Sequence, residues 1–172
     1  MNERPGEKIL ILGCPGSGKS FFAVKLAALT GLPLFHLDNI WWRADGTHLS
    51  REEFDEKLAA LLSLERWIID GDYSRTYETR IRASDTVFFL DFDTGTCVEG
   101  ITGRIGKERP DIPWVEKSPD PELLRMVRNY GEENRPVVLS LLGKYPGKRV
   151  FVFRSRDESV LWLSEFAGKG GF

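Results

Sequence analysis

The feature that most constrains this chain is segment 13–20, Gly-Cys-Pro-Gly-Ser-Gly-Lys-Ser, which fits the pattern G-x-x-x-x-G-K-[ST] at every position. An apolar run at 9–12 precedes it and predicts a buried parallel strand. Phe22, Leu26 and Leu29 follow it at helical spacing, which predicts a helix packed on a sheet. Because strand, glycine-rich turn and helix come in this order, the segment indicates a loop that binds a nucleoside triphosphate rather than a chance glycine turn.

The residue types of this loop suit a polyphosphate. Glycines allow the backbone amides to turn inward, and the N-terminus of the following helix adds partial positive charge. We expect Lys19 to bind the β- and γ-phosphates of ATP and to act in catalysis, and the Ser20 hydroxyl to bind Mg²⁺. The predicted nucleotide contacts in this region are Gly13, Pro15, Gly16, Ser17, Gly18, Lys19, Ser20 and Phe21.

Length and composition indicate one globular domain over residues 1–172. A net charge of -2 without a long basic block disfavours a dedicated nucleic-acid-binding protein. No apolar run approaches the roughly 20 residues of a membrane span, and residues 1–5 lack a signal-peptide core. Cys14 and Cys97 are far apart and form no metal-binding pattern, so we expect reduced thiols in a cytoplasmic protein.

Two acidic residues are predicted at the carboxyl ends of strands, where ligands collect in parallel sheets. Asp38 follows a predicted strand at 34–37, and Asp70 ends a predicted strand at 67–70. We interpret Asp38 as a catalytic and acceptor-binding residue, with a helix-capping loop aspartate as the alternative. We interpret Asp70 as a catalytic residue on the Mg²⁺ side, although a turn aspartate before glycine has the same appearance.

The predicted acceptor-binding region covers about 38–66, with a helix that begins at the capping box of Ser50 and Glu53. Trp41 and Trp42 are predicted in a loop, where they either form a wall of the binding pocket or cover the core. Arginines 75, 80 and 82 either grip an anionic acceptor or form a solvated face, and Arg75 lies nearest the strand end. The predicted acceptor contacts are Asp38, Trp42, Asp72, Tyr73 and Arg75.

The second half of the chain continues the alternation of strands and helices. A fourth strand is predicted at 86–90 and a glycine-rich helix at 94–106. The proline-rich segment 104–121 has almost no apolar period and carries Arg104 and Arg109, so it predicts a basic lid that closes over the phosphates. An inert mobile loop is the alternative.

The C-terminal part contains a predicted helix at 122–142, which Pro136 must kink or split. A last strand at 150–153 leads into Arg154 and Arg156, and Ser155 with Glu158 is typical of a second capping box. Five apolar strands alternating with helices predict a three-layer α/β/α domain with a parallel sheet.

Four segments carry a resemblance to a known family: 35–38 (Phe-His-Leu-Asp), 67–75 (Trp-Ile-Ile-Asp-Gly-Asp-Tyr-Ser-Arg), 109–111 (Arg-Pro-Asp) and 148–156. With the loop, they make the chain resemble the adenylate kinase-like P-loop kinases. More narrowly, it resembles the bacterial group labelled DNA topology modulation proteins. The resemblance implies a P-loop NTPase sheet of strand order 2-3-1-4-5 and places Arg154 and Arg156 near the adenine of the nucleotide. It also matches Asp70, Arg104 and Arg109 to functional positions of the family.

These patterns together predict a Mg-ATP-dependent kinase with a small acceptor such as a nucleoside, a nucleotide or a hydroxyl metabolite. The alternative is a nucleotide-dependent regulatory or DNA-interacting protein that affects DNA topology without a small-molecule acceptor. Nucleic acid is the less expected partner because non-specific DNA binding depends on an excess of Lys and Arg. Monomer and homodimer both remain open.

Overall fold

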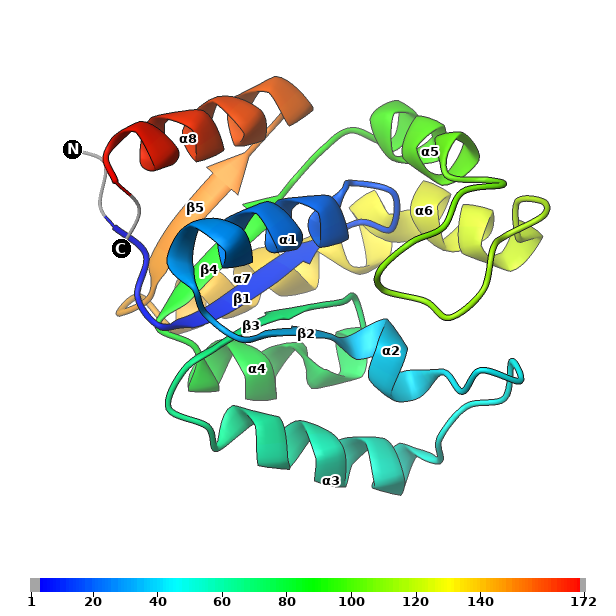
Figure 1. Cartoon of the computed structure of the whole chain (residues 1–172), viewed down its shortest axis with the longest axis horizontal. Coiled ribbons are helices and arrows are strands. Elements are labelled where there is room, and N and C mark those ends of the chain that lie inside the picture. The colour runs from blue at the N-terminus through cyan, green and yellow to red at the C-terminus, as the bar shows by residue number, and fades with distance from the viewer. Residues whose placement is uncertain (1–3, 171–172) are drawn as a thin grey trace.

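The computed structural model describes residues 4–170. Strands and helices alternate along these residues, as Figure 1 shows. The strands are β1 (Lys8–Gly13), β2 (Leu34–His36), β3 (Trp67–Asp70), β4 (Thr86–Leu90) and β5 (Arg149–Phe153). The helices are α1 (Lys19–Thr30), α2 (Leu37–Trp41), α3 (Arg51–Leu62), α4 (Tyr77–Ala83), α5 (Thr94–Gly103), α6 (Pro121–Glu133), α7 (Arg135–Lys144) and α8 (Arg156–Gly168), with a 3-10 turn η1 (Ser74–Thr76).

The strands form one parallel sheet in the order β2-β3-β1-β4-β5, which confirms the predicted fold class. Because β1 lies in the middle, its apolar residues are covered on both faces, and Ile9, Leu10, Ile11 and Leu12 are fully buried. Helices α1 and α8 pack together on one face, and α4 and α7 pack together on the other (Figure 1). The strand order brings the carboxyl ends of β1, β2 and β3 to one edge of the sheet.

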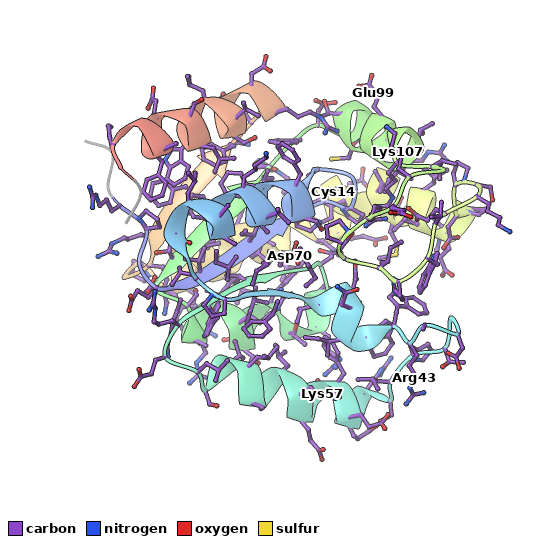
Figure 2. All side chains as sticks on the ribbon, viewed as in Figure 1. Cys14, Arg43, Lys57, Asp70, Glu99 and Lys107 are labelled. Atoms are coloured by element: carbon purple, nitrogen blue, oxygen red, sulfur yellow. The ribbon has the colours of Figure 1, made fainter. Side chains whose placement is uncertain are left out.

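Exposed charged side chains surround this core. Figure 2 shows Arg43, Lys57, Glu99 and Lys107 at the periphery of the view, while Asp70 projects into its middle. The two cysteines are free and buried. Within residues 4–170, no helix has the length and apolar character needed to cross a membrane.

Several local expectations are confirmed in the helices. Ser50 Oγ accepts a hydrogen bond from the Glu53 amide while the Glu53 carboxylate accepts one from the Ser50 amide, so the capping box is complete. Pro136 splits the predicted long helix into α6 and α7, because proline fits the first turn of a helix but not its interior. At α8, Ser155 accepts from the Glu158 amide, but the Glu158 carboxylate accepts from the Arg154 amide instead of Ser155, so this capping box is only half formed.

The predicted second strand is wrong at its end. Strand β2 stops at His36, and Leu37 begins the short helix α2. Asp38 and Trp41 therefore both lie on a helix, whereas Asp38 was predicted at a strand end and Trp41 in a loop. The Trp42 amide donates to the Asp38 carbonyl, which closes this helical turn.

Candidate active site

A cavity of about 780 Å³ opens at the carboxyl ends of the strands. Its volume lies within the range of small-molecule binding sites. The loop before α1, helix α2, the segment after β3, the predicted lid and the start of α6 all contribute to its walls. A single space therefore connects the predicted phosphate loop with the predicted acceptor-binding region.

The phosphate loop has the backbone that its glycines permit. Gly16 and Gly18 have φ values of 85° and 90°, a left-handed conformation that side chains other than glycine seldom adopt. Lys19 Nζ donates to the carbonyls of Gly13 at 2.9 Å and Cys14 at 3.1 Å, so the ammonium group is held over its own loop. An anion entering the loop meets this ammonium group together with the first amides of α1.

Helix α5 supports the loop through a contact between two glycines. A Cβ on Gly100 would lie 1.9 Å from the Gly16 carbonyl oxygen, and a Cβ on Gly16 would lie 2.1 Å from the Cys97 carbonyl oxygen. Arg156 reinforces the contact, since its guanidinium donates to the carbonyls of Gly16 at 3.2 Å and Thr96 at 3.0 Å. Glycine lowers the helix propensity of α5, but the absence of a side chain at Gly100 allows this helix to approach the loop closely.

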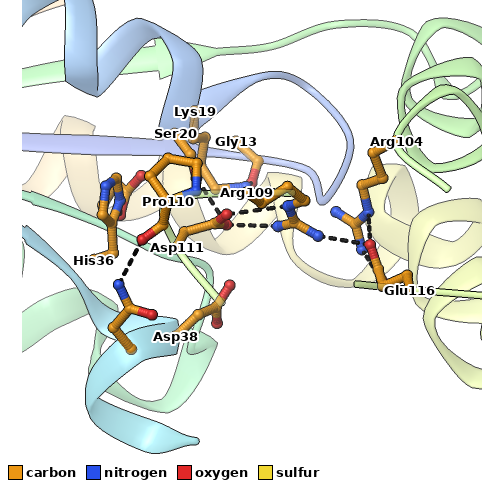
Figure 3. Close-up of polar contacts among 12 residues, drawn as sticks. Gly13, Lys19, Ser20, His36, Asp38, Arg104, Arg109, Pro110, Asp111 and Glu116 are labelled. Carbon is orange, nitrogen blue, oxygen red and sulfur yellow. Dashed lines mark hydrogen bonds and ion pairs between the residues drawn. The ribbon is translucent and has the colours of Figure 1, made fainter. Parts of the chain in front are cut away.

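The residues present fit a divalent cation beside the loop. Ser20 Oγ donates to Asp111 Oδ2 at 2.9 Å, and both residues line the cavity (Figure 3). Asp70 Oδ2 is buried and has no hydrogen-bond partner among the described residues. Hydroxyl and carboxylate oxygens are the ligands that Mg²⁺ prefers, and an unpartnered buried carboxylate oxygen calls for a positive partner.

Asp70 is oriented by a buried histidine. His36 Nδ1 and Asp70 Oδ1 are 2.9 Å apart, and both side chains are almost inaccessible to water. Burial would lower the pKa of His36, but the hydrogen bond and the charge of Asp70 outweigh it and raise the pKa above its usual range. His36 therefore holds one oxygen of Asp70 and leaves the other, Oδ2, without a partner among the described residues.

Asp38 forms a second polar pair that lines the same cavity. Tyr73 Oη donates to Asp38 Oδ1 at 2.7 Å. Burial raises the pKa of Asp38, and the Tyr73 hydrogen bond partly opposes this change. Burial and the neighbouring Asp38 charge also raise the pKa of Tyr73, so the phenol remains a hydrogen-bond donor. A half-buried carboxylate with a raised pKa is suited to accept a proton from a hydroxyl group.

Arg80 fixes the segment that carries Tyr73. Its side chain is fully buried and donates to the carbonyls of Gly71, Asp72 and Tyr73 and to Thr76 Oγ1. Burial lowers its pKa to about 10, so it is still charged at neutral pH. Tyr73 has a φ of 36°, which is uncommon for a side chain of its size and needs such support.

Ion pairs within the segment 104–121, the predicted lid, connect its own side chains. Arg109 donates to Asp111 at 3.0 and 2.5 Å and to Glu116 at 2.7 Å, and Arg104 lies 2.7 Å from the same Glu116 carboxylate (Figure 3). Burial would raise the pKa of Asp111, but its hydrogen bonds with Arg109 lower the pKa below its usual range. The lid therefore carries two guanidinium groups toward the cavity with their charges already matched.

The outer wall of the cavity is aromatic. The rings of Trp42 and Trp114 meet edge to face with centroids 5.5 Å apart, which joins the end of α2 to the lid. Trp41 also lines the cavity, and His48 stacks against it at 4.5 Å. Asn39 Nδ2 donates to the Pro110 carbonyl at 2.7 Å and makes a further connection between α2 and the lid.

Most of the residues predicted for the site lie around this one cavity. Its walls include Pro15, Gly16, Gly18, Lys19, Ser20, Phe21, Asp38, Trp42, Asp70, Asp72, Tyr73, Arg104, Arg109 and Arg156. Gly13 contributes its carbonyl to Lys19, and Ser17 is buried behind the loop. The Asp72 carboxylate is engaged by Tyr77 and Asn134.

Besides Gly13 and Ser17 of the loop, two further predicted residues, Arg75 and Arg154, do not line the cavity. Arg75 forms two hydrogen bonds with Asp55, at 2.9 and 2.7 Å, and lines a separate cavity of about 190 Å³. Arg154 donates to the Asp91 carboxylate, which also accepts from Arg135. In both cases the guanidinium group pairs with a carboxylate that is distant in the sequence, and it therefore does not reach the site.

Several residues of the site had no predicted role. Asp111, Trp114 and Glu116 lie in the proline-rich segment 104–121, where only the arginines had one, although Asp111 belongs to the Arg-Pro-Asp segment that carries the family resemblance. Arg80 was one of three candidate arginines, and nothing in its local pattern marks it as the buried one. A tryptophan and two acidic residues within a polar loop are the signal that was available for the lid.

Solved structures of similar fold are known. The chain superposes on a sugar kinase from Janibacter sp. HTCC2649 with a TM-score of 0.56 and 17% identity, covering 93% of this chain and 91% of that one. A gluconokinase from Sinorhizobium meliloti 1021 gives 0.55 and 17%, with 97% of each chain covered, and the shikimate kinase of Aquifex aeolicus gives 0.58 and 16%, with 94% of each. The chain shares the fold of these three structures, a five-stranded parallel sheet between layers of helices. No family model and no curated protein sequence matches the chain.

Proposed function

We propose that the protein transfers the γ-phosphoryl group of Mg-ATP to a hydroxyl group of a small acceptor. The observation that carries this proposal is the single cavity that joins the loop of Lys19 and Ser20 to the Asp38–Tyr73 pair. Phosphoryl transfer needs a donor and an acceptor in line, and little covalent chemistry from the protein. The similarity to sugar, gluconate and shikimate kinases supports the same class of reaction.

On the donor side, the loop amides and Lys19 hold the β- and γ-phosphates, and Lys19 leaves the carbonyls of Gly13 and Cys14 to do so. Ser20, Asp111 and Asp70 hold the Mg²⁺, which neutralises phosphate charge when bound. Phe21 and Arg156 flank the nucleotide, since both line the cavity next to the loop.

The lid arginines provide the remaining positive charge. Arg104 and Arg109 exchange part of their pairing with Glu116 and Asp111 for the migrating phosphoryl group. Because these side chains already lie on the cavity wall, their contribution requires a change of partner and only a small movement of the segment 104–121.

On the acceptor side, Asp38 accepts the proton of the attacking hydroxyl. Tyr73 holds one oxygen of Asp38, which leaves the other for the acceptor. Burial, which raises the pKa of Asp38, makes this carboxylate a stronger base than one in water. Trp42 and Tyr73 flank the acceptor, and Asp72 supports this wall through its hydrogen bonds.

The test is an ATP-consumption assay with purified protein and Mg²⁺ against nucleosides, nucleotides, sugars, gluconate and shikimate. We expect acceptor-dependent turnover, and Lys19→Ala is expected to lower it at least about 10³-fold while the protein stays folded. Lys57→Ala changes an exposed lysine on α3 and serves as the matched control. Turnover that survives Lys19→Ala would exclude this loop as the donor site.

The narrower resemblance, to the DNA topology modulation proteins, stays a prediction from the motifs. It leads to a different readout, namely a nucleotide-dependent shift of DNA mobility whose affinity falls with salt. Such a shift, without turnover of any small acceptor, would favour the alternative function.

A further inference from the structure

The charges around the cavity are unevenly distributed. Its basic residues are Lys19, Arg104, Arg109 and Arg156. Lys19 and Arg156 belong to the phosphate loop and its support, because both donate to loop carbonyls. The two lid arginines are paired with Glu116 and Asp111. Each of these four cations is therefore paired within the protein, and the proposed function assigns all four to the nucleotide or the migrating phosphoryl group.

The arginines closest to the acceptor side in the sequence are occupied elsewhere. Arg75 forms a two-pronged ion pair with Asp55 and lies outside the cavity. Arg80 is fully buried and directs its donors to backbone carbonyls and Thr76. Neither guanidinium group is directed toward the space next to Asp38, so a carboxylate or phosphate group there would have no cationic partner from these residues.

The fixed charge on the acceptor side is negative. Asp38 lines the cavity with one oxygen bonded to Tyr73, whereas Asp70 belongs to the Mg²⁺ side of the proposed site. The Asp38 carboxylate is largely withdrawn from water, in surroundings where repulsion between like charges is much less screened than in water. An anionic acceptor would meet this repulsion in addition to the loss of its own hydration.

The remaining acceptor wall consists of rings. Trp41, Trp42, Tyr73 and Trp114 line the same cavity, and Trp42 and Trp114 are only half buried. Their rings meet nearly at a right angle with centroids 5.5 Å apart, and both residues form part of the cavity wall. Aromatic faces bind the C–H face of a sugar ring or the flat face of a base, and they bind cations but not anions.

Given the proposed phosphoryl transfer, we propose that the acceptor is an uncharged ring compound with a hydroxyl group, of the pyranose or nucleoside kind, and not a carboxylate or a phosphate ester. The ring packs on Trp42 and Trp114, and the hydroxyl group points to Asp38. In the transfer step, the hydroxyl oxygen forms the new bond to the γ-phosphorus as the bond to the β–γ bridging oxygen breaks. ADP leaves with that electron pair, and Asp38 takes the hydroxyl proton.

The inference is tested by calorimetric binding to the full chain in the presence of Mg²⁺ and a non-hydrolysable ATP analogue. Two matched pairs differ in an anionic group: glucose with glucuronate, and adenosine with AMP. We expect the neutral member of at least one pair to bind about tenfold or more tightly than its partner, and the two pairs distinguish a sugar from a nucleoside. Tighter binding of the anionic member in both pairs, or no binding of either neutral member, would overturn the proposal.

Two variants address the two halves of the argument. Trp42→Ala is expected to weaken binding of the neutral compound by about tenfold or more, while Trp162→Phe, in the aromatic cluster between α8 and β5, leaves it unchanged. Asp38→Asn removes the negative charge and is expected to reduce the preference for the neutral member. A preference that persists unchanged in Asp38→Asn would contradict the electrostatic part of the proposal.

Binding and turnover separate this inference from the proposed function. Neutral compounds that bind without being phosphorylated would refute the kinase and keep the class of ligand. Phosphorylation of an anionic acceptor, with no binding of neutral ones, would keep the kinase and refute the acceptor class.

Discussion

The contact between helix α5 and the phosphate loop allows a sharp test of how the site is built. In Gly100→Ala, the new methyl group would lie 1.9 Å from the Gly16 carbonyl oxygen and 2.8 Å from an Arg156 nitrogen. An ordinary carbon–oxygen contact is about 3.3–3.6 Å, so loop and helix must separate by about 1.5 Å. The obstacle is backbone, which cannot rotate away as a side chain would.

This separation displaces the amides that we assign to the phosphates. Overpacking of a tight contact costs about 1–3 kcal/mol of folding free energy. Losing one or two charge-assisted hydrogen bonds costs about 1.5–3 kcal/mol each, so we expect nucleotide affinity to fall about 10- to 100-fold or more. Turnover at saturating ATP is expected to fall as well, because a displacement near 1 Å is enough to disturb in-line transfer.

Gly103 provides the matched control on the same helix. A Cβ at this position meets nothing within 4 Å. Gly103→Ala is expected to stabilise α5 by about 0.5–1 kcal/mol without any change in nucleotide affinity. Calorimetric titration of an ATP analogue and urea unfolding of both variants provide the measurements. Equal nucleotide affinities for Gly100→Ala and Gly103→Ala would refute the idea that α5 positions the loop.

Three further predictions concern the remaining walls of the cavity. Arg80→Met leaves three loop carbonyls without their donor and is expected to lower the free energy of unfolding by about 3–5 kcal/mol, whereas Arg82→Met, at an exposed position, has little effect. Equal urea midpoints for the two variants would contradict this prediction. Tyr73→Phe removes a hydrogen bond that favours ionised Asp38, so the pKa of Asp38 rises and the acidic limb of the pH profile of kcat/KM should move to higher pH by about one unit. An acidic limb that stays in place would count against Asp38 as the base. Glu116→Gln weakens the ion pairs of Arg104 and Arg109 and so frees these arginines for the nucleotide, and it is expected to lower the KM for ATP several-fold relative to Glu108→Gln at an exposed lid position. An unchanged or higher KM would mean that these arginines do not reach the nucleotide.

The central part of the fold was predictable because its signals are local. The strand, the loop at 13–20 and α1 are adjacent in sequence, and the apolar residues of β1 read as a run because both faces of the strand are covered. Pro136 and the box at Ser50 also act through a few neighbouring residues. The predicted end of β2 was wrong because a run of four apolar or neutral residues is compatible both with a strand and with the start of a short helix.

Charge partners are the part that local patterns do not contain. Arg75, Arg80 and Arg82 lie within eight residues, yet one pairs with Asp55 on α3, one is fully buried, and one is exposed. Asp111 and Glu116 satisfy the lid arginines, and Asp91 takes Arg154 away from the cavity. Which carboxylate meets which guanidinium group depends on the packing of separate elements.

The sequence by itself determined the phosphate loop, because one uninterrupted segment contains the strand end, the glycines, Lys19 and Ser20. The support of this loop by α5 and Arg156 is a tertiary contact. Only the tertiary structure decided the acceptor side. It brought Asp38 from α2, Tyr73 from the segment after β3 and Trp114 from the lid around one cavity, and it left the arginines paired elsewhere. The physical reason is that an acceptor site assembled from distant segments depends on the burial and charge pairing of the whole fold, which no short stretch of sequence encodes.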